Sequence, residues 1–345
     1  MSLEIHPFSL KIQDWYLKLK RDLPWRETKD PYKIWLSEII LQQTRVAQGL
    51  PYYMNFVENY PDVISLSKAP VEEVMRLWQG LGYYSRCRNM HETAKIIVEK
   101  YDAQFPNQFS ELIKLKGIGD YTAAAISSFS SQEAVAVLDG NVYRVLSRYF
   151  GILDDVSSTK TKKVFLEIAS QVLDISKPDL HNQAIMEFGA IQCTPKRSKC
   201  KTCPLIETCY AFNHNMVDKL PVKLKKTRLR EMNLFYAVLI ENNRILMKER
   251  TGEKNNIWKG LFDFPEISKE QFDHYVKLNP KLKTVTYQHQ LTHRKLNLNF
   301  MVSPVHLSDL NLVEGKFYDF SEVENLPKPI VIDRFIKELN KDKIF

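Results

Sequence analysis

The sequence predicts two domains of different fold class, a large helical domain followed by a smaller α+β domain. Up to about residue 212, apolar residues recur at helical spacing, as in PYKIWLSEIILQQT (31–44) and KKVFLEIASQVL (162–173). After residue 232, apolar and polar residues alternate as they do in strands. The decapeptide PVKLKKTRLR (221–230) separates the two textures and carries five positive charges without an acidic side chain. The expected boundaries are 1–212 for the helical domain, 213–231 for a basic linker and 232–345 for the α+β domain.

The composition is that of a globular protein without a membrane-spanning segment. The chain has 345 residues, 44% of them hydrophobic, which is enough for a large buried core. No run approaches eighteen apolar residues, and MSLEIHPFSLKIQDW (1–15) lacks the basic and apolar regions of a signal peptide. We therefore expect a cytoplasmic protein, and a monomer. The net charge of +8 is weak evidence for a nucleic-acid partner, because the linker accounts for most of it.

Two segments predict strands in the C-terminal part. NLFYAVLIENNRILMKER (233–250) has the pattern of two strands around an Asn-Asn turn. KLNLNFMVSPVHL (295–307) alternates as a further strand. These strands predict a small sheet, and the remaining segments leave room for helices that cover it.

Four of the five cysteines lie in CTPKRSKCKTCPLIETC (193–209), with the spacing C-x6-C-x2-C-x5-C. A cluster of this kind in a reducing compartment more often holds a metal than a disulfide. The ligands are Cys193, Cys200, Cys203 and Cys209. Four thiolates suit either a [4Fe–4S] cluster or a structural zinc, and ligand chemistry leaves both open, although the usual zinc pattern has two C-x2-C pairs. The fifth cysteine, Cys87, is expected to be packed in the core.

The segment LKGIGDYTAAAISSF (115–129) has the form of two helices joined by a tight turn. Gly117 and Gly119 permit backbone conformations that other residues avoid, and they expose amide groups at the start of a helix, where a phosphate oxygen binds readily. An ordinary turn between two helices is the alternative.

Two carboxyl groups stand in positions suited to cleavage of a glycosidic bond, which needs an acid for the leaving group and a negative charge for the cationic sugar. Glu38 lies inside the apolar helix SEIILQQTR (37–45), where burial should raise its pKa. Asp139 follows an apolar run in VLDGNVYRV (137–145) and precedes a helix. The alternatives are an exposed helix face for Glu38 and a simple helix N-cap for Asp139.

Taken together, these motifs resemble the endonuclease III superfamily of DNA glycosylases, whose fold contains a helix-hairpin-helix and an iron–sulfur loop. PWR (24–26), SEIILQQT (37–44), GLGYYSR (80–86), VLDGNV (137–142) and the cysteine loop follow the order found in the adenine-specific family. The resemblance implies a [4Fe–4S] cofactor. It also implies duplex DNA as the partner and removal of adenine mispaired with 8-oxoguanine or guanine. The basic side chains between the cysteines would contact phosphates.

The resemblance assigns roles to single residues. Glu38 would protonate adenine at N7, Asp139 would stabilise the cationic sugar or bond transiently to it, and Asn141 and Arg26 would support the pocket. The residues implied to occupy the base stack when adenine is flipped out are Gln42, Gln43 and Tyr83.

Tyr121 separates this chain from the bifunctional relatives. Those enzymes have a lysine at this place in the hairpin's second helix, which attacks the sugar and leads to strand cleavage. A phenol forms no imine, so we expect a monofunctional glycosylase. Lys116, before the turn, is a poor substitute.

The C-terminal part resembles a Nudix domain. NNIWKGLFDFPEI (255–267) is similar to the W-x-G-L-x-x-F-P segment, whereas the acidic metal box of the hydrolases is missing. In the adenine-specific family this domain reads 8-oxoguanine through Phe-Ser-His on a β-hairpin. The corresponding residues here are Leu291, Thr292 and His293, so leucine replaces the aromatic residue.

Two other functions remain open at the level of the sequence. A glycosylase of the same fold could act on a mismatched thymine or an oxidised pyrimidine. An iron–sulfur protein could also bind DNA without catalysis, and the presence of both Glu38 and Asp139 argues against that.

Overall fold

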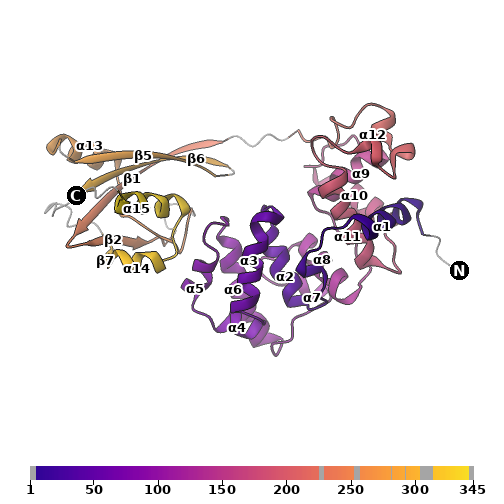
Figure 1. The fold of residues 1–345 in the computed structure, drawn as a ribbon, viewed down its shortest axis with the longest axis horizontal. Helices are drawn as coiled ribbons and strands as arrows, with labels where there is room; N and C mark the ends of the chain where they lie inside the picture. Colours follow the sequence, from indigo (N-terminus) through magenta and orange to yellow (C-terminus); the bar gives the residue numbers. More distant parts are fainter. Residues whose placement is uncertain are drawn as a thin grey trace. The chain divides into compact units, whose positions relative to one another are not determined.

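The structure is a computed structural model that describes residues 5–224, 229–251, 257–280, 282–291, 293–303 and 314–341. It divides into two compact units (Figure 1). Unit 1 comprises residues 1–68 and 89–226, and unit 2 comprises residues 69–88 and 227–345. The sequence pattern assigned residues 69–88 to the helical domain, whereas their contacts group them with the C-terminal part.

Unit 1 is helical throughout its described residues. Its helices are α1 (Pro7–Leu19), α2 (Pro31–Leu41), α3 (Val46–Asn59), α4 (Val63–Lys68), α6 (Ser85–Lys100), α7 (Phe109–Leu112), α8 (Asp120–Ser131), α9 (Gly140–Phe150), α10 (Thr159–Val172), α11 (Pro178–Glu187) and α12 (Tyr210–Asn213). Helix α6 begins in unit 2 and continues in unit 1. Helix α2 packs on α8, and α11 packs on α1, α8 and α9. These contacts bring together helices whose side chains line the candidate active-site pocket.

Local sequence signals fix the ends of the helices around that pocket. Asp30 caps α2 by accepting a hydrogen bond from the Tyr32 amide at 2.9 Å, and Pro31 occupies the first turn. Helix α9 ends at Gly151, whose φ of 73° is left-handed. A Cβ at Gly151 would lie 2.5 Å from the Tyr210 ring. Glycine therefore both terminates α9 and lets α12 approach it closely.

The chain leaves unit 1 along its surface. The Val156 amide donates to the Val222 carbonyl at 3.0 Å, and the Leu224 amide donates to Asp155 at 3.3 Å. Residues up to 224 therefore contact unit 1, within what the sequence predicts as linker. Residues 225–228 lie outside the described residues, and the first strand begins at Arg230.

Unit 2 contains a mixed sheet. Its described strands are β1 (Arg230–Glu241), β2 (Arg244–Glu249), β3 (Phe262–Asp263), β4 (Glu266–Ile267), β5 (Lys283–Gln290), β6 (Arg294–Ser303) and β7 (Lys316–Asp319). They lie in the order β3-β2-β1-β6-β5, with β4 also paired to β1 and β7 to β2. Strands β1 and β6 are parallel, and β5 and β6 form an antiparallel hairpin. The tip of that hairpin is the segment in which the sequence predicts lesion recognition.

Helices cover both faces of this sheet. On β1, Ala237 packs into a cluster that includes Phe272 and Tyr275 of α13 (Lys269–Leu278). The preceding residue, Tyr236, stacks on Phe300, which in turn stacks on Phe335 of α15 (Ile330–Lys341). Because successive strand residues point to opposite faces, α13 and α15 lie on opposite sides of the sheet (Figure 1).

The strand predictions are confirmed. Strands β1 and β2 meet at Asn242 and Asn243, whose φ values of 49° and 61° are those of a tight hairpin turn. Strand β6 ends at Ser303, and residues 304–313 lie outside the described residues. Among the described helices, none combines the length and apolar character needed to cross a bilayer.

Residues 69–88 join unit 2 through specific contacts. The Tyr84 hydroxyl donates to the Lys328 carbonyl at 3.4 Å, and Arg88 donates to the Lys259 carbonyl. Lys328 is itself buried, and its ammonium donates to the Val323 carbonyl at 2.7 Å, at the end of α14 (Phe320–Asn325). This docking places the turn that contains Tyr83 in the same unit as the β5–β6 hairpin.

Candidate active site

Glu38 lies in the middle of α2 with its carboxyl group removed from water. Only 7% of the residue is exposed, and its helical neighbours Ser37 and Ile39 are buried as well. The Tyr121 hydroxyl, from the first turn of α8, donates to Glu38 Oε2 at 2.6 Å. The alternative of an exposed helix face is therefore wrong, and α2 and α8 hold an acid and a phenol together.

Burial raises the pKa of Glu38 to about 7. The hydrogen bond from Tyr121 opposes that shift, and the negative charge of nearby Asp139 adds to it. The pKa of Tyr121 is also raised, first by burial and then by the charge of Glu38, so the phenol stays protonated and remains a donor. A carboxyl group with this pKa is protonated in about half of the molecules near neutral pH and can act as a general acid.

Asp139 ends an extended segment and caps α9. Its Oδ1 accepts from the amides of Asn141 at 2.9 Å and Val142 at 2.7 Å, and Oδ2 accepts from the Asn141 side chain at 2.7 Å. Burial raises its pKa above the ordinary value, and these hydrogen bonds oppose that shift without cancelling it. Asp139 is thus a helix N-cap and also a partly buried carboxyl group beside Glu38. An N-cap and a carboxyl group suited to glycosidic cleavage, which the sequence offers as alternatives, are therefore compatible.

Both carboxyl groups line one pocket of about 190 Å³ in unit 1. Tyr121 and Asn141 line it as well. Residues of the loop before α2, including Trp25 and Arg26, form another wall, and α11 contributes Gln183 and Glu187. The predicted residues Glu38, Asp139, Tyr121, Asn141 and Arg26 therefore meet around one space, although they come from four separate segments.

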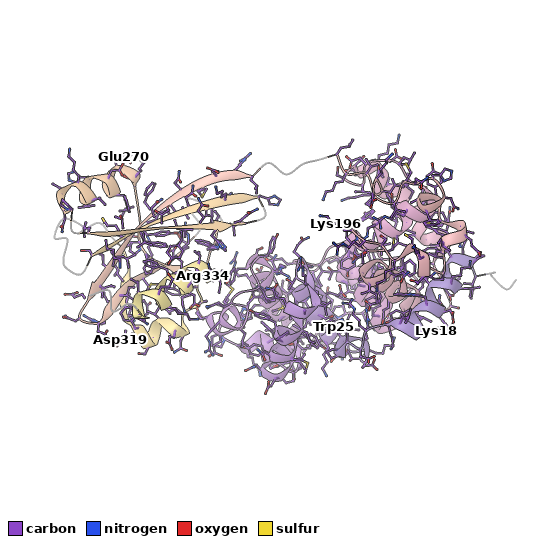
Figure 2. All side chains as sticks on the ribbon, turned by 45° about the horizontal axis from the view of Figure 1, so that its top comes forward. Lys18, Trp25, Lys196, Glu270, Asp319 and Arg334 are labelled. Carbon is purple, nitrogen blue, oxygen red and sulfur yellow. The ribbon has the colours of Figure 1, made fainter. Side chains whose placement is uncertain are left out.

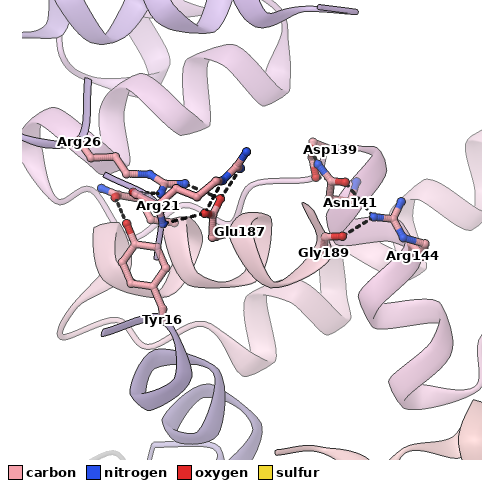
Figure 3. A network of polar contacts seen from close by, with 9 residues as sticks. Tyr16, Arg21, Arg26, Asp139, Asn141, Arg144, Glu187 and Gly189 are labelled. Atoms are coloured by element: carbon pink, nitrogen blue, oxygen red, sulfur yellow. Dashed lines mark hydrogen bonds and ion pairs between the residues drawn. The ribbon is translucent and has the colours of Figure 1, made fainter. Parts of the chain in front are cut away.

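A buried ion-pair network adjoins this pocket (Figure 3). Glu187, 1% exposed, accepts from Arg21 Nε at 2.7 Å and Nη2 at 2.6 Å, and from Arg26 Nη2 at 2.7 Å. Arg26 also donates to the Arg21 carbonyl at 2.8 Å. The two guanidinium groups hold the pKa of Glu187 at about 2, against the effect of its burial. The network fixes Arg26 in the pocket wall.

A second network joins the pocket to the cysteine loop, and Figure 3 shows its contacts among Asn141, Arg144 and Gly189. Arg144, one turn into α9, donates to Asn141 Oδ1 at 2.8 Å and to the Gly189 carbonyl at 2.7 Å. Its Nε donates to the Cys193 carbonyl at 2.8 Å. Asn141 thus contacts Asp139 with its amide nitrogen and Arg144 with its amide oxygen.

The four cysteines of the loop line one apolar pocket together with Val145, Phe188 and Leu205. Burial raises the pKa of Cys203 to about 12 and that of Cys209 above its ordinary value, so a bound cation would be needed to hold these groups as thiolates. Within the described ranges, no three His, Cys, Asp or Glu side chains are arranged so as to hold a single metal ion. In a [4Fe–4S] cluster each iron takes one thiolate, so the four sulfur atoms need to surround one pocket and need not converge on a single metal ion. The four cysteines fit such a cluster because they line one pocket.

Arg148 holds the cysteine loop against α9. It is 3% exposed and donates to the Thr194 carbonyl and the Ser198 hydroxyl, each at 2.8 Å, and to the Leu220 carbonyl at 3.0 Å. The basic side chains of the same loop, by contrast, are exposed to solvent. They are Lys196, labelled in Figure 2, and Arg197, Lys199 and Lys201.

The glycine-rich turn lies between α7 and α8. Gly117 has a φ of 79°, and a Cβ there would lie 2.9 Å from Asn89 Cβ. Gly119 caps α8 with a φ of −100°, which any residue adopts, so the prediction of a special conformation holds for Gly117 and is wrong for Gly119. Lys116 pairs with Glu92 at 2.5 Å on the surface. No lysine from this turn lines the pocket.

The residues predicted to occupy the base stack lie at turns. Gln42 ends α2 and donates to the Thr122 hydroxyl at 3.2 Å. Gln43 is exposed with a φ of 57°, and Tyr83 of unit 2 is 42% exposed with a φ of 49°. Left-handed φ values are uncommon for residues with a Cβ and are concentrated at functional sites.

Leu291 and His293, two of the residues that the sequence predicts to recognise the lesion, lie at the tip of the β5–β6 hairpin. Leu291 and His293 line a pocket of about 420 Å³ in unit 2, together with Tyr83 and Trp258. Thr292 lies outside the described residues. The Leu291 amide donates to the Arg294 carbonyl at 2.7 Å, which closes the hairpin. The pocket therefore combines the hairpin tip with the turn of residues 80–85.

Sequence reasoning missed part of this site. Glu187 and Arg21 lie 166 residues apart, and neither stands in a local motif. Glu187 follows Met186 in a helix, and its other close neighbours in the sequence are apolar as well. A single acid among apolar residues was the available signal that Glu187 is buried. In the sequence, Trp258 indicates only the resemblance to a Nudix domain. Its position in the pocket of unit 2 depends on contacts between segments that are distant in the sequence.

Comparisons with known proteins cover both units. A family profile described as "HhH-GPD superfamily base excision DNA repair protein" matches residues 36–171, and one described as "NUDIX domain" matches residues 235–338. A protein named adenine DNA glycosylase from Buchnera aphidicola subsp. Schizaphis graminum is 36% identical over 343 residues, 95% of this chain and 98% of that protein. The Homo sapiens protein of that name is 41% identical over 217 residues, 60% of this chain and 40% of its own. A solved structure of a thermostable thymine-DNA glycosylase, 28% identical, matches 60% of this chain and 95% of its own with a TM-score of 0.56.

The ion-pair network yields a prediction about stability. Glu187→Gln should lower the free energy of unfolding by about 3 kcal/mol near neutral pH, because two arginines lose their buried anionic partner. The pKa of Glu187 is about 2 in the folded protein against an ordinary 4.5, so its stabilisation is complete above about pH 4.5 and is lost as the pH falls toward 2. Urea unfolding at several pH values should show the difference between wild type and variant shrinking across this window.

Glu92→Gln is the matched control, because Glu92 pairs with Lys116 on the surface. It should change the free energy of unfolding by no more than about 0.5 kcal/mol at any of these pH values. A Glu187→Gln effect that stays constant from neutral pH to about pH 3 would contradict the assignment.

Proposed function

The chain belongs to the adenine DNA glycosylase family, and we propose that it hydrolyses the N-glycosidic bond of adenine mispaired with 8-oxoguanine or guanine in duplex DNA. The observation that supports this most directly is Glu38, a buried carboxyl group whose pKa is raised to about 7, facing Asp139 across one pocket. We expect the protein to act as a monomer in the cytoplasm, in contact with the nucleoid.

Glu38 acts as the acid in this proposal. In its protonated form it donates a proton to N7 of the flipped adenine, and the base then leaves as a neutral molecule. The Tyr121 hydroxyl holds Glu38 Oε2 at 2.6 Å, which leaves Oε1 for the proton that is transferred. Arg26 and Gln183, on the other walls of the pocket, would orient the base.

Asp139 stabilises the positive charge that develops on the sugar. Its carboxylate is held by two backbone amides and by Asn141, so it needs no rearrangement when the charge appears. Water then completes the hydrolysis. Because Tyr121 occupies the place of the lysine that would form an imine, the reaction stops at the abasic site and the strand stays intact.

Base flipping and DNA contact use the exposed elements. Gln42, Gln43 and Tyr83 would fill the space that the adenine leaves, since side chains at exposed turns can enter a base stack. The turn at Gly117 and the basic side chains of the cysteine loop would bind phosphates along the backbone.

The Nudix domain supplies recognition of the opposite base. The pocket of about 420 Å³ in unit 2 contains Tyr83, Trp258, Leu291 and His293, which offer aromatic surface and a hydrogen-bonding imidazole for a purine. Leu291 stands where the family has an aromatic residue, so it would wedge the base by apolar contact alone. Thr292 is assigned to this function from its sequence position.

A [4Fe–4S] cluster bound by Cys193, Cys200, Cys203 and Cys209 is the proposed cofactor. When bound, it would cross-link the loop and hold its basic side chains where they can contact the phosphates of the DNA backbone.

The cofactor proposal predicts a brown protein with about four irons per chain. Metal analysis of the purified protein, with Cys203→Ser as the variant, is the measurement, and the variant should lose iron and colour together. One stoichiometric zinc in a colourless protein would contradict the cluster and would leave the glycosylase proposal standing.

The acid role predicts that Glu38→Gln abolishes adenine release while mispair binding persists. The amide keeps the shape of the carboxyl group and has no acidic proton to transfer, so the single-turnover rate should fall by about 100-fold or more. Duplexes with A·8-oxoG, A·G, T·G and thymine glycol, treated with alkali after incubation, should show wild-type cleavage only at adenine. Release from T·G instead would support the thymine-specific alternative, and near-normal release by the variant would remove Glu38 from the mechanism.

The recognition role predicts that His293→Ala in the full chain lowers the preference for A·8-oxoG over A·G. One hydrogen-bonded contact to the lesion is worth roughly 1–3 kcal/mol, so the preference should fall about 5- to 150-fold. Single-turnover rates on A·G should stay close to wild type. Equal losses on both duplexes would instead make the hairpin a general DNA clamp.

A further inference from the structure

The segment of residues 132–139 brings Asp139 into the pocket without forming regular secondary structure. It connects α8 to α9, and its middle residues Ala136 and Val137 are buried. Buried backbone groups outside helices and sheets need other hydrogen-bond partners. At the start of the segment, the carboxyl group of Glu133 accepts from the Phe109 amide at 2.7 Å. The position of Asp139 therefore depends on what holds the middle of the segment.

One side chain, Asn182 of α11, supplies these partners. Its Oδ1 accepts from the Val137 amide at 3.2 Å, and its Nδ2 donates to the Val135 carbonyl at 2.8 Å. The same nitrogen donates its other proton to the Ser128 hydroxyl at 2.8 Å. Asn182 is 1% exposed, and both of its amide protons are used.

These three contacts join three of the elements that line the pocket or lead into it. Ser128 belongs to α8, which presents Tyr121, and Asn182 belongs to α11, which presents Glu187. Val135 and Val137 belong to the segment that ends at Asp139. The Asn182 side chain is the place where α8, α11 and the segment are hydrogen-bonded to one another.

We propose that Asn182 is a positioning residue for the reaction, which fixes the Asp139 carboxylate relative to Glu38 by holding the backbone of residues 135–137. This rests on the proposed function. Asn182 does not line the pocket, so it acts through the backbone and not on the substrate. Without it, the Val137 amide and the Val135 carbonyl lose their buried partner and the segment shifts. Misplacement of a reacting group by about 1 Å can reduce a rate by about 100-fold.

The test uses Asn182→Ala and the milder Asn182→Ser in the full chain. Single-turnover excision should slow by about 10- to 100-fold for the alanine variant and less for the serine variant. The dissociation constant for a duplex with a non-hydrolysable adenosine opposite 8-oxoguanine should change by less than about 3-fold, since no DNA contact is lost. A loss of affinity as large as the loss of rate would overturn the proposal.

Gln13→Ala is the matched control, because Gln13 is a buried amide in unit 1 that donates to Asp174 at 3.0 Å, away from the pocket. It should lower the melting temperature without slowing excision. If it slows excision as much as the Asn182 variants do, general destabilisation explains the rates and the positioning role is wrong.

A double-mutant cycle with Asp139→Asn separates positioning from a general structural effect. If Asn182 acts through Asp139, adding Asn182→Ala to Asp139→Asn should slow the residual rate by less than about 2-fold. A further loss as large as that in the wild-type background would overturn the proposal. The cycle is measured with Asn182→Ala if this variant keeps a cooperative unfolding transition, and otherwise with Asn182→Ser.

The ratio of variant to wild-type rates is measured on whichever duplex the wild-type protein cleaves. Cleavage of T·G or thymine glycol in place of adenine would contradict the proposed function, and the same cycle would still decide the role of Asn182.

Discussion

The structure of unit 1 depends on keeping the carboxyl group of Glu38 out of water without a paired cation. Burying a carboxylate costs free energy, and the Glu38 carboxyl group has the phenol of Tyr121 as its hydrogen-bond donor. Its protonated form is therefore favoured, and its pKa rises to about 7. That environment requires the close packing of α2 on α8, which the small buried residues Ala123, Ala124 and Ala125 permit. A better-solvated Glu38 would have a lower pKa and would be mostly ionised at neutral pH, so it would be a poorer proton donor there.

The second carboxyl group shows how one pocket supports two different roles. Asp139 is also partly buried, but it accepts three hydrogen bonds and lies at the positive end of the α9 dipole. These contacts favour its charged form, whereas the charged form of Glu38 is favoured by one hydrogen bond from Tyr121 and by the charge of Arg26. We propose that these contrasting environments make Glu38 the proton donor and Asp139 the fixed negative charge. The charge of Arg26 opposes the raised pKa of Glu38, and Glu187 limits this effect because it pairs with both Arg21 and Arg26.

The sequence predicted the parts of the site that have a local signature. An acid within an apolar helix implied burial of Glu38, and Asp139 before a glycine implied a helix cap. Four spaced cysteines implied one set of ligands for a cluster or a metal, and the Asn-Asn pair implied a turn. The partnership of Glu187 with Arg21 and Arg26, the three contacts of Asn182, and the grouping of residues 69–88 with unit 2 had no such signature. They depend on which distant surfaces pack together, and local periodicity contains no information about that.

Helix α9 relates the chemistry to the cysteine loop. Asp139 and Asn141 stand at its beginning, and Arg144 and Arg148, which hold the loop, follow one and two turns later. A helix of 11 residues is a stiff rod roughly 16 Å long, so the loop and the carboxylate are fixed to one rigid element. Asn182 fixes the same carboxylate from the preceding segment. The position of Asp139 is thus set from both sides along the chain, as its proposed role in stabilising a short-lived cation requires.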